Sequence, residues 1–441
     1  MTRLLIAASP RVATQVAAGN FLNARAELPI VTDLSMTCKS PRSSFLRLAL
    51  PLSSDAALRT RFVNAAGFVR VGRLLEELDA FAGAIALLHC DDGDASRAMP
   101  SVVTAAFDRV DLLRSVRANE DLEFAGAVTH AGRSSLNIDV ELTTASGELV
   151  FTAATTFVAR VAADKGVAVP VPRLVAITPA DAALAAIGER AANERKARAA
   201  SSFFRVPPTA DELSVLHDLF LESSGASEGG GGDSWVRAPP MSMSHTAHHH
   251  QHQQQQQQQQ QHVTFTDETR VSSTIVTMPE DRNIYGKMFG GYLLKAAYEI
   301  AWSCGWRATG VAPQFLALDA VTFRAPVDVG TLLRMDAQIA FADDDRISIT
   351  VDATMSVPGR AGPGETPTNQ FSFVFKVPRI EGEAEVPPQK FAPRTYAEGL
   401  SLLAARRRAL AHKPPHVVIH ETQEGLQCSR FPSEWRGNQR R

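Results

Sequence analysis

The chain has 441 residues, a length at which two or three domains are expected rather than one. Hydrophobic residues make up 45% and charged residues 21%, as in ordinary globular proteins, and the net charge of −2 gives no reason to expect nucleic acid or a membrane surface as a partner. Four cysteines without CxxC spacing favour a reducing compartment over a disulfide framework or a zinc site, and no apolar run reaches the roughly 20 residues of a membrane span.

Residues 1–40 form a leader that we expect to contribute nothing to the fold. It carries Arg3, Arg11 and Arg25 among apolar residues, with no acidic residue before Glu27. Arginines without acidic neighbours are typical of a mitochondrial presequence, so we predict a mitochondrial protein. The alternative is a disordered basic leader without a targeting role.

The rest of the chain divides into two comparable parts. Residues 223–262 contain GGGG, PP, HHHQH and nine consecutive glutamines, a composition that cannot bury a core. We therefore predict an N-terminal domain at 41–175, a helical connector at 176–222, a low-complexity Gly/His/Gln linker at 223–262, a C-terminal domain at 263–395, and a C-terminal helix with a basic tail at 396–441.

The two parts resemble each other, which predicts an internal repeat. NAAGFVRVGRLLEELDAFAGAIA begins at Asn64, and NIYGKMFGGYLLKAAYEIAWSCG begins at Asn283, 219 residues later. Further along, FDRVDLL at 107–113 matches LDAVTFR at 318–324, now 211 residues apart. Long alternating runs typical of antiparallel strands follow in both parts. One helix with four or five strands is therefore predicted twice.

The second of these helices is apolar around most of its circumference, with Lys295, Glu299 and Ser303 as its polar residues. A helix of this kind is buried. A domain with one such helix and a long antiparallel sheet should wrap the sheet around the helix, which is the hotdog architecture. We predict an α+β tandem, or double, hotdog, with the two sheets side by side.

NxxGxxFGG followed by a helix is similar to the motif of hotdog acyl-CoA thioesterases. Together with HAGRSS, FRAPVDVGTLL and KFAPRTYAEGL, in this order, it resembles the mitochondrial subfamily with two hotdogs, over roughly 42–222 and 264–408. The resemblance implies hydrolysis of acyl-CoA to a free fatty acid and coenzyme A. It also implies no metal or redox cofactor, and a homo-oligomer, in some members a trimer of double hotdogs.

The paired glycines Gly290 and Gly291 are candidates for an oxyanion hole. A helix N-terminus presents unpaired N–H groups and partial positive charge, and glycine lets a carbonyl approach them. The resemblance places the acidic residue seven positions after the second glycine of a repeat, which is Asp79, and adds an asparagine, Asn283. Asp79 would act as general base or as nucleophile. The alternatives are close helix packing for the glycines, an exposed acid for Asp79 and a turn residue for Asn283.

The family also implies that each site takes residues from both repeats. Asp79, Asn283, Gly290 and Gly291 would then form one site. The other would combine Asn64 and Gly72 with Tyr298 or Glu299, and it looks degenerate because tyrosine stands where the acid should be. We predict one working site in each chain.

Other candidates are weaker. Arg133, Ser134 and Lys287 could contact coenzyme A phosphates, although a turn role is equally consistent for the arginine. His89 and Cys90 are neighbours that cannot face each other on a helix, so a buried helix end is the better interpretation. Asp108 and Asp319 begin equivalent strands and are expected to be structural.

Two other classes of function are left. A hotdog dehydratase would require a catalytic histidine, and neither NAAGFVRVG nor NIYGKMFGG contains one. A non-catalytic acyl-CoA-binding or regulatory protein is the main alternative, because Val71 and Tyr298 depart from the motif.

Overall fold

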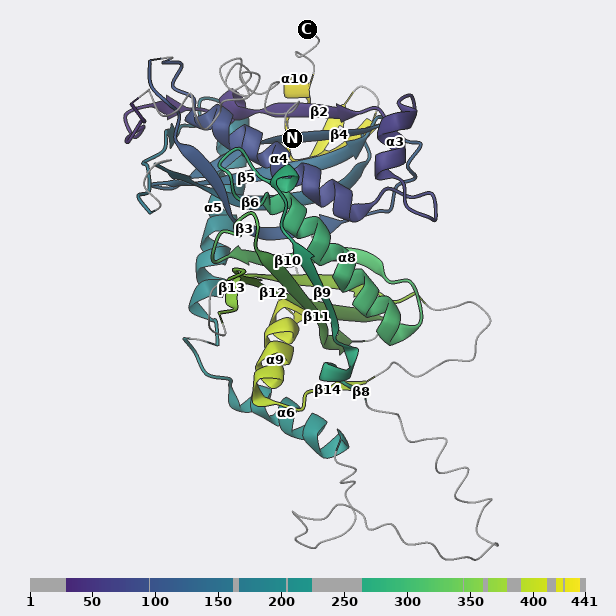
Figure 1. Ribbon diagram of the computed structural model, residues 1–441. Coiled ribbons are helices and arrows are strands. Elements are labelled where there is room, and N and C mark those ends of the chain that lie inside the picture. The colour runs from purple at the N-terminus through teal and green to yellow at the C-terminus, as the bar shows by residue number, and fades with distance from the viewer. Residues whose placement is uncertain are drawn as a thin grey trace, which may run out of the picture.

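A single antiparallel sheet of ten strands organises the protein (Figure 1). A computed structural model of the chain describes residues 29–94, 96–161, 166–203, 205–223, 264–343, 345–359, 364–378, 390–410, 418–422 and 425–436. Most of the predicted leader and nearly all of the predicted linker lie outside these residues.

Each repeat contributes five neighbouring strands to the sheet. The strands of the first repeat are, in spatial order, β2 (Leu46–Leu50), β4 (Leu122–Ala131), β5 (Ser135–Thr144), β6 (Leu149–Arg160) and β3 (Ser101–Leu112). Those of the second are β10 (Gln314–Phe323), β13 (Thr366–Lys376), β12 (Arg346–Ser356), β11 (Leu332–Asp343) and β9 (Val271–Val276).

The two halves join where β3 pairs with β10, with Val110 opposite Leu318 and Phe107 opposite Val321. Both strands are irregular at matching points: pairing shifts between Thr104 and Ala106 in β3, and between Phe315 and Ala317 in β10. The 211-residue offset therefore relates the backbones as well as the letters. The predicted double hotdog, with sheets side by side, is confirmed.

Two long helices, α4 (Val71–Cys90) and α8 (Gly290–Thr309), pack against one face of the sheet and against each other (Figure 1). They are antiparallel, so the first turn of each contacts the second turn of the other. A Cβ atom on Gly291 would lie 2.6 Å from the carbonyl oxygen of Glu76. One on Gly72 would lie 3.1 Å from the Tyr298 ring. Glycine is therefore needed for this approach, most strictly at Gly291.

The remaining helices include α5 (Pro179–Ala200), α6 (Ala210–Ser223), α9 (Tyr396–Leu410) and the short α3 (Ala56–Phe62). Ala125 and Ala127 of β4 pack with Leu184 of α5, whereas Gly126 between them faces Ile85 of α4. Successive strand residues point to opposite faces, so α5 covers the face that α4 does not. Short strands complete the description: β1 (Cys38–Lys39) pairs with β7 (Arg173–Leu174), and β8 (Thr264–Phe265) pairs with β14 (Phe391–Ala392).

The C-terminal region is more than the basic tail that the sequence suggested. After α9 it contains a hairpin of β15 (Val418–Thr422) and β16 (Gly425–Ser429), then α10 (Ser433–Arg436). Phe431 and Trp435 are buried against Phe45, and the Ser429 hydroxyl donates to buried Glu141 at 2.7 Å. The prediction missed this docking because the segment is short and polar, and its partners belong to the first repeat.

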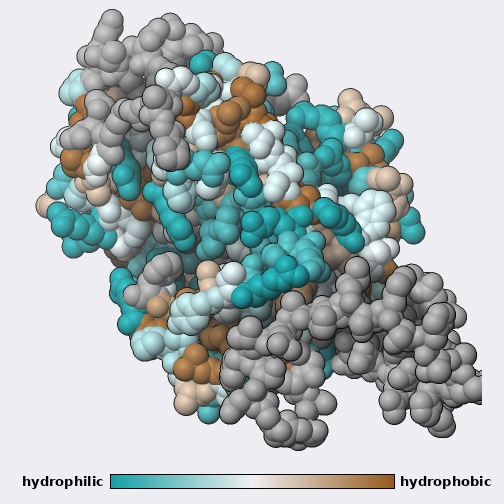
Figure 2. Space-filling view, turned by 60° about the horizontal axis from the view of Figure 1, so that its bottom comes forward, coloured by the Kyte–Doolittle hydropathy of each residue, from teal (hydrophilic) through white to brown (hydrophobic). Residues whose placement is uncertain are grey.

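The surface offers no extended apolar area in the view of Figure 2, where hydrophobic side chains of the described residues form small groups among hydrophilic ones. Among the described residues, no helix is both long and apolar enough to cross a membrane.

The helix crossing predicts unequal effects of alanine at the two equivalent glycines. Gly291→Ala should lower the free energy of unfolding by about 1–3 kcal/mol, because the methyl group meets a backbone carbonyl that cannot move aside. Gly72→Ala should cost less, since the Tyr298 ring can yield. Thermal and urea unfolding of both variants would test this, and equal losses would contradict it.

Candidate active site

The loop before each helix has the same construction in both repeats. Asn283 accepts the backbone N–H groups of Tyr285 and Lys287 on its Oδ1, at 2.9 and 3.1 Å. Gly286 follows at φ 77°, a left-handed conformation that favours glycine. Asn64 makes the same two contacts in the first loop, at 3.0 Å each. Both asparagines thus build a turn through Oδ1, which leaves Nδ2 as the group for any role on a substrate.

Asp79 lies where the two repeats meet. Its side chain comes from α4, is 2% exposed, and contacts the start of α8: a Cβ atom on Gly290 would lie 2.8 Å from Oδ2. Thr104 of β3 donates its hydroxyl to Oδ1 at 2.8 Å, and the backbone N–H of Gly291 also donates to the carboxylate. Asp79 and the GG pair, 211 residues apart in the chain, are therefore one constellation.

The charge state of Asp79 follows from this environment. Burial raises its pKa to about 6, while the hydrogen bonds from Thr104 and Gly291 act in the opposite direction by stabilising the anion. The positive end of the α8 dipole also favours a negative charge here. The carboxyl is therefore ionised near neutral pH, yet it can take up a proton within the physiological range.

The start of α8 also supplies donors that the helix does not use itself, because the first N–H groups of any helix lack intrahelical acceptors. Gly291 directs its N–H to Asp79. The N–H of Gly290 then is the donor best suited to an oxyanion beside the carboxylate, since no Cβ atom covers it.

The equivalent location in the other half is filled with rings. Tyr298 occupies the place of Asp79 and packs against Gly72, with its ring 5.5 Å from that of Phe315, the counterpart of Thr104. Burial raises the pKa of Tyr298. Glu299 points away to form an ion pair with Arg70 at 2.8 Å, and its side chain is 49% exposed. Neither group takes the position of the buried carboxylate.

Thr104 was missed from the sequence, although a signal was present. The match of 107–113 to 318–324 could have been extended three residues back, where a threonine stands opposite Phe315. A hydroxyl in one repeat against a phenyl ring in the other is the difference that a polar site requires.

The weaker candidates lie outside this constellation. Arg133 and Ser134 sit in the turn between β4 and β5, where their carbonyl oxygens accept N–H groups from Val171 and Ala159. Lys287 is ion-paired with Asp328. Their contact with coenzyme A stays a prediction.

The His89–Cys90 pair and the two strand aspartates are accounted for by packing. Nε2 of buried His89 lies 3.1 Å from the carbonyl oxygen of Pro172, and burial lowers its pKa to about 4. Burial raises the pKa of the Cys90 thiol to about 12, which makes it a poor nucleophile. Asp108 pairs with Arg195 at 2.8 Å, and Asp319 pairs with Arg109 at 3.2 Å.

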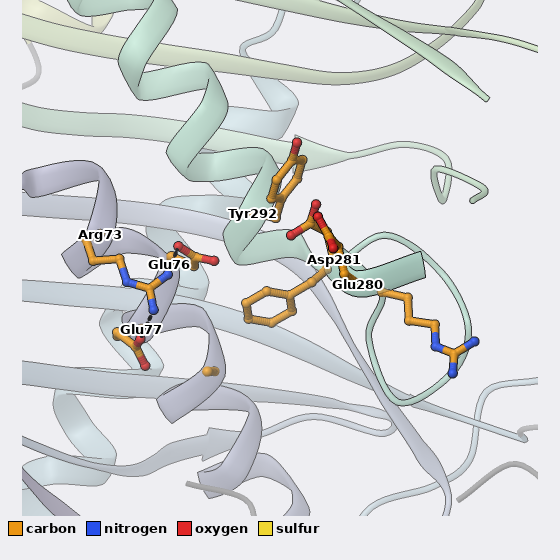
Figure 3. Close-up of a pocket in the computed structure, with 9 residues that line it drawn as sticks. Arg73, Glu76, Glu77, Glu280, Asp281 and Tyr292 are labelled. Carbon is orange, nitrogen blue, oxygen red and sulfur yellow. Dashed lines mark hydrogen bonds and ion pairs between the residues drawn. The ribbon is translucent and has the colours of Figure 1, made fainter. Parts of the chain in front are cut away.

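An acidic cleft of about 110 Å³ adjoins the site between the first turns of α4 and α8. Figure 3 shows Arg73 reaching Glu76 and Glu77 on one side, with Glu280, Asp281 and Tyr292 on the other. Burial raises the pKa of Asp281. Four carboxylates at one opening disfavour phosphate groups, so the cleft suits an uncharged part of a ligand better.

These features define a double hotdog with one buried carboxylate at the start of the partner repeat's helix. The family model for the thioesterase superfamily matches residues 66–151, which include Asp79 and Thr104.

Particular relatives extend the similarity over most of the chain. Human mitochondrial acyl-coenzyme A thioesterase 9 is 28% identical over 83% of this chain and 77% of its own length. Mouse mitochondrial acyl-coenzyme A thioesterase 10 is 26% identical over 85% and 79%. The chloroplastic acyl-coenzyme A thioesterase 2 of Humulus lupulus is 29% identical over 78% and 75%. The resemblance inferred from the motifs is confirmed.

The raised pKa of Asp79 predicts a pH-dependent gain of stability in Asp79→Asn. The native state holds the proton up to about pH 6 and the unfolded chain releases it near 3.8, so the wild type loses stability between these values, by about 3 kcal/mol in total. Asparagine does not titrate and escapes this loss.

Urea unfolding of both proteins between about pH 4.5 and 7.5 measures the effect. The difference in favour of Asp79→Asn should grow with pH. Glu299→Gln, which alters a half-exposed carboxylate, is the control and should show no such trend. A difference that stays constant with pH would contradict the prediction.

Proposed function

We propose that the protein is an acyl-CoA thioesterase that hydrolyses acyl-CoA to a free fatty acid and coenzyme A at one composite site. The observation that carries the proposal is the buried Asp79 carboxylate of the first repeat, held against Gly290 and Gly291 at the start of the second repeat's helix. The similarity to acyl-coenzyme A thioesterases over most of the chain supports it.

In the proposed reaction the thioester carbonyl oxygen lies at the N–H of Gly290, where the α8 dipole stabilises the negative charge that develops on it. Ionised Asp79 removes a proton from a water molecule that attacks the carbonyl carbon. The C–S bond then breaks, and the coenzyme A thiolate takes up the proton from Asp79. Attack by Asp79 itself, through an anhydride that water then cleaves, needs the same ionised carboxylate.

The neighbouring groups have supporting roles in this scheme. Thr104 and the Gly291 N–H hold the carboxylate in one orientation. Asn283 offers its Nδ2 to the water or the carbonyl, since its Oδ1 is engaged in the turn. The acidic cleft would accept an uncharged portion of the substrate, and the phosphates of coenzyme A would lie elsewhere.

The alternative of a non-catalytic acyl-CoA-binding protein finds its support in the second location, where rings replace the polar pair. It does not account for the first. A carboxylate kept buried and ionisable without a basic partner costs stability, which a binding surface does not require.

Turnover of the variants tests the proposal. Asp79→Asn should reduce coenzyme A release from acyl-CoA by at least about 10³-fold, because no group can accept the proton of water. In the wild type, kcat/KM should rise with pH and level off above about 6, as the carboxyl ionises.

The two asparagines provide a matched pair. Asn283→Asp keeps the Oδ1 acceptor that the turn needs but removes the Nδ2 donor, so activity should fall by about 10²-fold. Asn64→Asp makes the same change at the ring-filled location and should leave activity unaltered. Equal loss in both variants would point to the turn, and wild-type inactivity over a series of chain lengths would favour the binding protein.

We also propose a mitochondrial location. Human thioesterase 9 and mouse thioesterase 10 are named mitochondrial, and the leader carries arginines without acids. Fusing residues 1–40 to a fluorescent protein should direct it to mitochondria, and replacing Arg3, Arg11 and Arg25 by glutamate should leave it in the cytosol. Import that survives this replacement would contradict a presequence. Assembly into a trimer of double hotdogs stays a prediction for light scattering.

A further inference from the structure

A tyrosine of the second repeat is bonded to the strand of the first repeat that carries Thr104. The hydroxyl of Tyr285 accepts the backbone N–H of Val102 at 2.9 Å, across 183 residues of sequence. Tyr285 stands two residues after Asn283 in the loop before α8, and Val102 stands two residues before Thr104 in β3. The loop and the strand are thereby tied together on either side of Asp79.

The position of Val102 in the sheet explains why this N–H needs an outside acceptor. β3 pairs with β10 only between Ala106 and Asp111, so its first residues extend past the end of that pairing. On the other edge Val102 lies opposite Ala159 of β6. A buried N–H beyond the end of the β10 ladder has to find another acceptor, and the phenol supplies it.

The equivalent contact cannot form in the other half. The counterpart of Tyr285 is Ala66, 219 residues earlier, which has no hydroxyl. The counterpart of Val102 is Pro313, 211 residues later, which has no N–H. Both partners are thus absent at the location where Tyr298 and Phe315 replace Asp79 and Thr104. The bond and the polar pair occur together, although the surrounding turn is shared by both repeats.

We propose that Tyr285 is a positioning residue for thioester hydrolysis, which rests on the function proposed above. It fixes the loop that carries Asn283 and Gly290 to the strand that carries Thr104, and so keeps the carbonyl site of one repeat in register with the carboxylate of the other. A displacement of about 1 Å between such groups can cost 10²-fold in rate. The hydroxyl itself touches neither substrate nor the reacting atoms.

The test compares Tyr285→Phe, Tyr396→Phe and the wild type by coenzyme A release. Tyr285→Phe should lower kcat by about 10–100-fold and change KM by less than about threefold, because the carbonyl and base lose register in the transition state. Tyr396 lies on α9 with 66% of its surface exposed, and removing its hydroxyl should change neither constant.

A second variant separates positioning from folding. Val102→Pro removes the donor and reproduces what Pro313 already provides in the other repeat. It should show the same loss of kcat, and the double variant should lose no more than either single one, since both remove one bond. Unfolding transitions of all proteins report whether the fold persists.

Each result decides between the two proposals. Wild-type turnover with kcat of Tyr285→Phe within twofold of it, or losses that multiply in the double variant, would overturn the role of Tyr285 and leave the thioesterase in place. A folded wild type without turnover on any acyl-CoA would overturn both.

Discussion

The site depends on how closely the starts of two antiparallel helices can approach. Gly291 brings the backbone of α8 against the Glu76 carbonyl of α4, and the ion pair between Glu76 and Lys295 at 3.1 Å closes the same crossing. With any larger residue at Gly291 the helices would separate. The Asp79 carboxylate would then leave the donors and the positive end of α8, which are what make its ionised form tolerable in a buried position.

Duplication gave the protein two such crossings, and the two have diverged in chemistry while keeping their frame. Turn asparagines, left-handed glycines and strand irregularities recur in both repeats. At one crossing the side chains are Asp79 and Thr104. At the other, Tyr298 and Phe315 belong to a cluster of rings with Phe373 and Phe375. The second crossing thus adds apolar packing, and packed rings contribute stability that a buried carboxylate costs.

Much of this arrangement could be predicted from sequence because it is encoded by short patterns. The repeat was visible in two constant offsets, the buried helix in its apolar circumference, and the pairing of Asp79 with Gly290 and Gly291 in a family motif. The turn role of Asn283 was an open alternative, and the structure describes its Oδ1 in that role without engaging Nδ2 in it.

What could not be predicted depends on contacts between distant segments. Thr104 and Tyr285 are ordinary residues of a strand and a loop, and only the register of β3 against the loop before α8 brings them to Asp79. The C-terminal hairpin is a similar case: Glu141 is fully buried in β5, and its acceptors are satisfied by Ser429 and Arg430, nearly 300 residues later. A buried carboxylate in a strand predicts that a donor must exist, because an unpaired one would be too costly, but sequence distance carries no sign of which segment supplies it. The donors that hold a carboxylate in place, at the site and at the C-terminal segment alike, are therefore the part of this fold that only the three-dimensional arrangement reveals.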